Sequence, residues 1–136
     1  MYSWTNNLPS IGLPASGTGS IASFTAVNAT NSNVTATIIV TPIAYGCSGL
    51  SKTSTILVYP TPNINTITRA TCTGVSFSVS PVNGTNGVVP ATTLYSWDPP
   101  LITSQLNPGT SGSLTSTISG YFSHTSVAAE TATYTI

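Results

Sequence analysis

Alternation of apolar and polar residues is the feature that most limits the fold of this chain. Between residues 34 and 40, every second residue is apolar, so these side chains share one face of an extended strand, while Thr35 and Thr37 take the other. The same pattern recurs in residues 54–58, 75–80 and 132–136. Apolar residues nowhere repeat at helical spacing beside good helix formers, so the sequence predicts an all-β fold without helices.

Clusters of Gly, Pro, Asn and Ser separate these segments and are typical of turns. Short strands with a turn signal at intervals of roughly 8 to 12 residues indicate a β-sandwich or barrel. We favour the sandwich, with Trp4 and Trp97 as core residues. The turn clusters are residues 14–19, 28–33, 45–49, 83–87 and 108–112.

Charge is almost absent from the chain. Its 136 residues include 25 Thr and 20 Ser but only four charged side chains, Lys52, Arg69, Asp98 and Glu130. Zero net charge and the lack of a basic cluster argue against a nucleic-acid partner. Apolar runs are too short for a membrane helix and the N-terminus lacks signal-peptide regions, so we expect no membrane insertion in this segment. This composition is typical of secreted β proteins and predicts an extracellular location.

Three short matches, which keep the same order and phase, indicate an internal repeat. Its period of 93 to 96 residues implies about one and a half modules. We therefore expect residues 1–60 to be the C-terminal part of one module and residues 61–136 the N-terminal part of the next. Pro60 and Pro62 predict a stiff connector between them. The matches are Tyr-Ser-Trp at 2–4 and 95–97, Gly/Ser-rich loops at 17–20 and 109–113, and Thr-Ala-Thr at 35–37 and 131–133.

The two cysteines occupy different places in the expected repeat. Cys47 falls in a turn before the last strand of the first copy, and Cys72 at the first strand of the second. Shifted by one period, each lands outside the chain, so we expect complete modules to have a disulfide that ties the first strand to the last. Two alternatives stay open, which are buried free thiols and a direct bridge between Cys47 and Cys72.

Candidate chemistry is sparse. His124 is the single histidine, and neither Asp98 nor Glu130 has a carboxylate or imidazole nearby in sequence, so acid–base pairs and triads lack parts. We expect no catalytic residue, cofactor or metal site, because Ca²⁺ and Zn²⁺ need grouped ligands. The sequons at residues 28–30, 33–35 and 83–85 are interpreted as turns. The aromatic candidates for sugar stacking are Tyr45, Tyr59 and Tyr121.

The order of these motifs resembles the PKD-like, immunoglobulin-like repeats of Bacteroidota surface proteins. The first copy is similar through residues 2–7, the Thr35-Ala36-Thr37 strand that ends in Thr41-Pro42, residues 46–49 and residues 58–62. The second copy is similar through residues 72–74, 77–87, 95–97 and 131–134. The resemblance covers nearly the whole chain. It implies a PKD-like β-sandwich in a long tandem array on secreted proteins, including gliding-motility adhesins of the SprB type, exported by the type IX system.

The resemblance supplies no catalytic residues and favours a mechanical function. We expect a structural or adhesive repeat in the stalk or filament of a cell-surface adhesin, whose partners are neighbouring repeats and a surface polysaccharide. Because the register begins and ends inside modules, strand complementation between copies is a further hypothesis. The alternative function is a carbohydrate-binding or accessory module of a secreted hydrolase.

Overall fold

The structure, a computed structural model, describes residues 1–103, 105–107 and 109–136, and it separates the chain into two compact units. Unit 1 is Met1–Thr61 and unit 2 is Pro62–Ile136. The division falls inside the segment where the sequence places the joint. That the units are parts of longer modules stays a prediction.

Strand pairing stops around this division. The last strand of unit 1 ends at Val58 and the first strand of unit 2 begins at Asn63. Of the two prolines between them, Pro60 is buried and Pro62 is exposed. Proline provides no backbone N–H for a ladder, which explains why neither strand extends across this segment.

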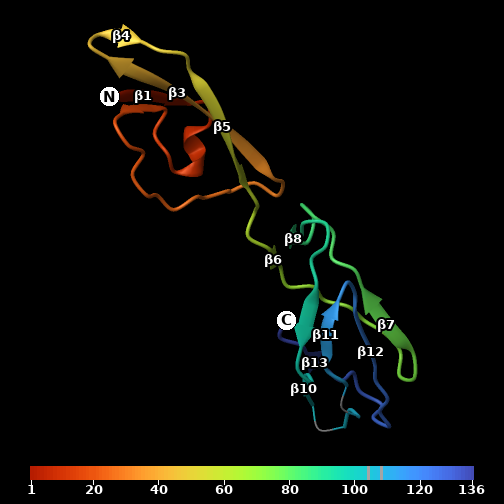
Figure 1. The fold of residues 1–136 in the computed structure, drawn as a ribbon. Helices are drawn as coiled ribbons and strands as arrows, with labels where there is room; N and C mark the ends of the chain where they lie inside the picture. Colours follow the sequence, from red (N-terminus) through yellow and green to blue (C-terminus); the bar gives the residue numbers. More distant parts are fainter. Residues whose placement is uncertain (104, 108) are drawn as a thin grey trace. The chain divides into compact units, whose positions relative to one another are not determined.

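Unit 1 is built on one five-stranded antiparallel sheet (Figure 1). Its strand order is β2-β1-β3-β4, and β5 also pairs with β3. The long β3 is therefore the centre of the sheet, with β1 on one side and β4 and β5 on the other. The elements are β1 (Tyr2–Asn6), η1 (Pro9–Ile11), β2 (Ser16–Thr18), β3 (Val34–Ala44), β4 (Cys47–Ser48) and β5 (Lys52–Val58).

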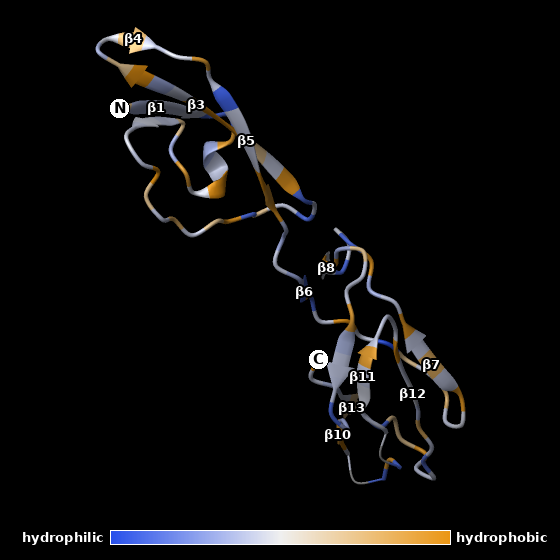
Figure 2. Cartoon of the chain, in the orientation of Figure 1, coloured by the Kyte–Doolittle hydropathy of each residue, from blue (hydrophilic) through white to orange (hydrophobic). Residues whose placement is uncertain are grey.

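One face of this sheet carries the core of unit 1. The alternation predicted from residue 34 onward is present in β3, where Ala36 and Ile38 are buried and Thr35 is exposed. The chain around η1 covers this face and adds Ile11 and Leu13 to the core, together with the partly buried Phe24. Figure 2 shows that β5 is hydrophilic where it begins and hydrophobic towards its end, where Ile56 and Val58 pack on the same core.

The β3–β4 connection is a two-residue hairpin turn. Ala44 pairs with Cys47, and the two residues between them, Tyr45 and Gly46, both have positive φ, at 50° and 82°. Positive φ at both central positions matches the right-handed twist of the flanking strands. The turn expected at residues 45–49 is therefore present, but shorter than the sequence suggested.

Unit 2 consists of short two-stranded antiparallel ladders. The pairs are β6 with β8, β7 with β12, β9 with β11, and β10 with β13. Its core joins Val79, Val89, Tyr95, Trp97 and Ile118. The strands are β6 (Asn63–Ile64), β7 (Ser76–Val79), β8 (Gly87–Val88), β9 (Tyr95–Trp97), β10 (Leu101–Ile102), β11 (Gly112–Thr115), β12 (Ile118–Tyr121) and β13 (Ala132–Thr133).

The all-β prediction is confirmed, and several details of it are wrong. The structure has a three-residue 3₁₀ helix, η1, where no helix was expected. Residues 14–19 were expected to be a turn, but they contain β2. The loop expected at residues 109–113 overlaps β11, and Pro108, at the start of the expected 108–112 turn, lies outside the described residues. Residues 132–136 form a strand only over Ala132–Thr133.

Candidate functional site

Each unit contains a tryptophan that packs over a glycine on the neighbouring strand. In unit 1, Trp4 of β1 lies opposite Gly17 of β2, and in unit 2, Trp97 of β9 lies opposite Gly112 of β11. A Cβ atom on either glycine would overlap the indole ring. Glycine in a strand often marks such a close approach. This is why glycine-rich segments that resemble loops in the sequence are strands in the structure.

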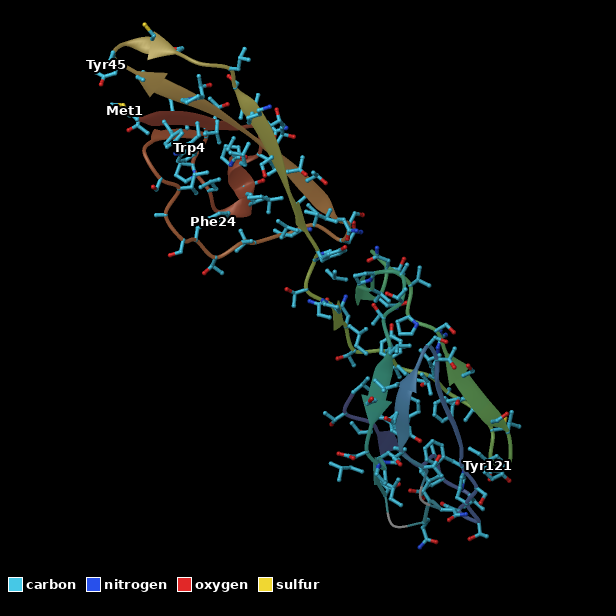
Figure 3. All side chains as sticks on the ribbon, viewed as in Figure 1. Met1, Trp4, Phe24, Tyr45 and Tyr121 are labelled. Carbon is cyan, nitrogen blue, oxygen red and sulfur yellow. The ribbon has the colours of Figure 1, made fainter. Side chains whose placement is uncertain are left out.

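Both tryptophans are core residues, as predicted. Trp4 is 8% exposed and Trp97 is 6% exposed. Their polar atoms differ, because Trp97 Nε1 donates a hydrogen bond to the Thr110 carbonyl at 3.0 Å, whereas Trp4 Nε1 is buried with no partner among the described residues. Figure 3 shows Trp4 and Phe24 on the same side of the unit 1 sheet. The two tryptophans thus have a structural role.

A candidate binding feature is a cavity of about 700 Å³ within unit 2. It lies between the segment of residues 64–73 and the C-terminal segment of residues 129–136. The side chains around it are mainly apolar and come from five different parts of the unit. The apolar side chains that matter here are Ile64, Ile67, Phe77, Val79, Ile118 and Tyr134.

Strand β13 forms one wall of this cavity and is paired along one edge. Its partner is β10, where Thr133 faces Leu101 and Ala132 faces Ile102. The Thr131 carbonyl accepts a hydrogen bond from Thr103 N at 3.1 Å, which extends the same ladder. Because neighbouring residues of a strand direct their backbone groups to opposite edges, the N–H of Ala132 points to the other edge, beside the cavity.

An aromatic cluster forms the inner part of the cavity wall. The Phe77 and Phe122 rings stack at 5.6 Å between centroids, and Tyr134 meets Trp97 edge-on at 6.3 Å. The Tyr134 hydroxyl is buried and has no hydrogen-bond partner among the described residues. Burial raises the pKa of Tyr134 above its ordinary value of 10.0. The hydroxyl lies beside Gly109 and Gly120, which do not line the cavity, so the ring of Tyr134 rather than its oxygen contributes to the wall.

Arg69, His124 and Glu130 also line the cavity. The Glu130 carboxylate accepts a hydrogen bond from the Thr103 hydroxyl. The His124 backbone N–H donates to Thr73 Oγ1 at 3.0 Å, while its Nδ1 is buried without a partner among the described residues. Within the described part of the chain, no three His, Cys, Asp or Glu side chains are grouped as metal ligands would be.

The cysteines are free and exposed. Cys47 was expected in a turn, but it is the first residue of strand β4 in unit 1, directly after the β3–β4 turn. Cys72 lies between β6 and β7 in unit 2 and accepts a backbone hydrogen bond from Val75, so its expected position in the first strand is wrong. The exposure of both thiols contradicts the alternative of buried free thiols, and a direct Cys47–Cys72 bridge stays untested because the two cysteines belong to different units. Pairing with cysteines outside the chain stays a prediction.

The aromatic candidates for sugar binding come from different elements. Tyr45 lies at the tip of the β3–β4 hairpin and Tyr121 ends β12 in the other unit (Figure 3). Tyr59 follows β5. All three are exposed. A sugar-stacking face normally groups its aromatic rings, and within unit 1 Tyr45 and Tyr59 lie near opposite ends of β3, so these two do not form one platform.

The sequon residue Asn28 acts as a turn residue. Its side-chain oxygen accepts hydrogen bonds from Thr30 N at 2.9 Å and from Thr30 Oγ1 at 2.7 Å. Its amide nitrogen donates to the carbonyls of Ser32 and Val58, which fastens the loop to the end of β5. These bonds are those expected of an Asx-type turn.

Sequence reasoning missed a buried polar residue, Asn6. It is 4% exposed, donates to the Leu13 carbonyl at 2.8 Å and accepts from Leu8 N at 3.0 Å. These bonds hold the chain around η1 against the sheet. The sequence offered no signal for this role, since Asn6 and Asn7 are adjacent and look alike.

Comparisons with known proteins give no match: no protein family, no curated protein and no solved structure is similar to this chain. In the described residues, no helix has the length and hydropathy required to cross a membrane.

Proposed function

We propose that this chain is a structural segment of a long bacterial cell-surface protein, in which similar β units are joined in tandem as the stalk or filament of an adhesin. The fold type proposed for each complete unit is an immunoglobulin-like or PKD-like sandwich, as the sequence resemblance implies. A role in gliding motility and export by the type IX system belong to the same proposal.

The observation that carries the proposal is the shared construction of the two units. Each places a Tyr-Ser-Trp strand beside a second strand whose glycine accommodates the indole ring. In both units the Thr-Ala-Thr segment directs its alanine inward and its threonines outward, since Ala36 and Ala132 are less exposed than their neighbours. Two units built alike in one chain favour a repetitive protein.

The surface chemistry supports an extracellular stalk. Hydroxyl and amide groups, rather than charges, provide the polar surface. Few lysines and arginines leave few sites for trypsin-like proteases, which is useful for an exposed filament. The exposed cysteines are compatible with disulfides in an oxidising compartment.

A carbohydrate-binding or hydrolase-accessory module is the alternative, and the separation of Tyr45 from Tyr59 within unit 1 favours it less. We still propose surface polysaccharide as a partner of the array, bound by individual exposed tyrosine rings. A glycan array tests this directly, because a signal that disappears on Tyr121→Ala supports the alternative.

The surface location is tested with antibodies raised against the 136-residue chain. We expect them to label intact source cells and to detect a protein much larger than 13.9 kDa on a denaturing gel. An antibody to a cytosolic protein provides the permeabilisation control. Labelling only after permeabilisation, or a parent protein of about the size of this chain, overturns the proposal.

A further inference from the structure

We propose that the cavity of unit 2 is an acceptor groove for one β-strand, and that its occupant is a strand of the β5 type from the repeat itself. This inference depends on the proposed repeat for the identity of the strand. The groove itself is described by its own residues.

Unit 1 contains the filled form of the same arrangement. There β3 pairs with β1 along one edge and with β5 along the other, over the seven residues Lys52–Val58. The counterpart of β3 in unit 2 is β13, which carries the second Thr-Ala-Thr segment. Among the described residues, β13 pairs with β10 alone. Both residues of β13 line the cavity, and the edge of β13 opposite β10 corresponds to the edge of β3 that β5 occupies in unit 1.

Burial differs between the units in the way that a missing neighbour predicts. In β3, Ala36 is fully buried and Ile38 is 2% exposed. The corresponding residues of unit 2, Ala132 and Tyr134, are only partly buried, and Ile136 is 45% exposed. An apolar strand along this edge would cover all three side chains and pair backbone groups that the edge leaves open.

The β5 pairing in unit 1 fixes the expected register. Ala36 faces Ile56, and Ile38 faces Ser54. Transferred to unit 2, Ile56 of the incoming strand would face Ala132, and Ser54 would face Tyr134. The small serine would leave room for the larger tyrosine ring.

The identity of the strand follows from the chemistry of the groove. Apolar side chains and threonines make up most of the lining, beside Arg69, His124 and Glu130, so it fits a strand with an apolar residue at alternate positions. Residues 54–58, Ser-Thr-Ile-Leu-Val, have this pattern. A folded second copy is a poorer donor, because its β5 would first have to leave β3.

The test is a titration of the full isotope-labelled chain with a synthetic peptide of residues 51–59, followed by NMR. The chain has two tryptophans, one in each core, so the two indole N–H signals report on the units separately. We expect a saturable shift of the Trp97 signal, which contacts Tyr134 of the groove, while the Trp4 signal stays unchanged.

Two peptide variants provide a matched pair. Ile56→Asp places a charge on the face that enters the groove and is expected to weaken binding about tenfold or more. Leu57→Asp places the same charge on the opposite face and is expected to change binding much less. Equal losses for the two peptides overturn the proposed register.

The acceptor edge is tested in the chain by Ala132→Pro. Proline removes the N–H that points to the open edge while keeping the ladder to β10, so we expect peptide binding to be lost with the spectrum still dispersed. If this variant unfolds, the peptide pair still decides the question. An unchanged Trp97 signal at saturating peptide overturns the proposal. That result leaves the surface labelling, and with it the proposed function, unaffected.

Discussion

The two units use one strand pattern in two different surroundings. In unit 1, the alternating strand β3 has neighbours on both edges, and its inward residues are almost completely buried. In unit 2, the corresponding strand β13 has a neighbour on one edge, is ordered as a strand over two residues, and keeps its inward residues partly exposed. Alternation therefore determines which side chains of a strand face the core, whereas the neighbouring strands determine how long the strand is and how deeply those side chains are buried.

The same comparison explains where the cores are. Unit 1 covers the single face of its sheet with the chain around η1, held by Asn6. The ladders of unit 2 are short, and its aromatic side chains Phe77, Trp97 and Phe122 pack around Tyr134 instead. We therefore expect each unit to depend on its own tryptophan and to respond separately to substitution.

Replacement of the tryptophans is expected to change the stability of the two units most. Trp4→Ala and Trp97→Ala should each destabilise their own unit by about 3–5 kcal/mol, because a buried aromatic side chain is replaced by a cavity. Loss of dispersed NMR signals in one unit only is the expected result. Leu57→Ala, at a half-exposed position on the outer face of β5, is the control. Simultaneous loss of both sets of signals would contradict separate folding.

The glycines beneath the tryptophans give the next largest effect. Gly17→Ala and Gly112→Ala should each cost about 1–3 kcal/mol, since the added methyl overlaps the indole ring and forces it to move. Urea unfolding of each variant measures the change. Ser16→Ala and Ser113→Ala, at exposed neighbouring positions, should be nearly neutral. Glycine variants as stable as these controls would mean that the rings do not pack on the backbone here.

Much of the strand pattern was predictable from the sequence, and the reasons for the misses are physical. Alternation in residues 34–40 placed Ala36 and Ile38 inside correctly, and the tryptophans were recognisable as core residues. The strands β2 and β11 were missed because glycine and serine signal turns when their neighbours are unknown. Only the indole ring across the strand explains why Gly17 and Gly112 are in strands.

The candidate site was less predictable than the fold. The incomplete β13 edge followed from the register of the repeat, which suggested strand complementation. The cavity itself depends on Ile64, Ile67 and Phe122, which show no pattern that links them in sequence. Long-range packing brings these residues together, and a single sequence does not encode that contact in any local spacing.

Alkaline pH should distinguish the units by a smaller effect. Burial raises the pKa of Tyr95 and Tyr134, both in unit 2, above 10.0, while Tyr2, Tyr45 and Tyr59 of unit 1 are exposed. The unfolded chain then loses these protons at lower pH than the folded unit. The stabilising contribution is complete below about pH 10 and is lost as the pH rises through the folded pKa.

Urea unfolding between about pH 8 and about pH 11 measures this effect. We expect the midpoint of unit 2, followed by the Trp97 signal, to fall more steeply than that of unit 1. Tyr95→Phe, which keeps the ring and removes the hydroxyl, should reduce the slope. Parallel slopes for the two units would show that the buried hydroxyls do not govern the difference.

The cysteines give the smallest expected effect and separate this chain from a longer form of the protein. Cys47→Ser and Cys72→Ser should each change the unfolding free energy of the 136-residue chain by about 0.5 kcal/mol or less, because both thiols are free and exposed. In a protein that provides the predicted disulfide partners, the same substitutions should cost about 2–5 kcal/mol. The unfolding free energy of the 136-residue chain and of the longer protein is measured with and without reductant, and the cost of each substitution is compared between them. Equal costs in both would remove the disulfide from the proposed module.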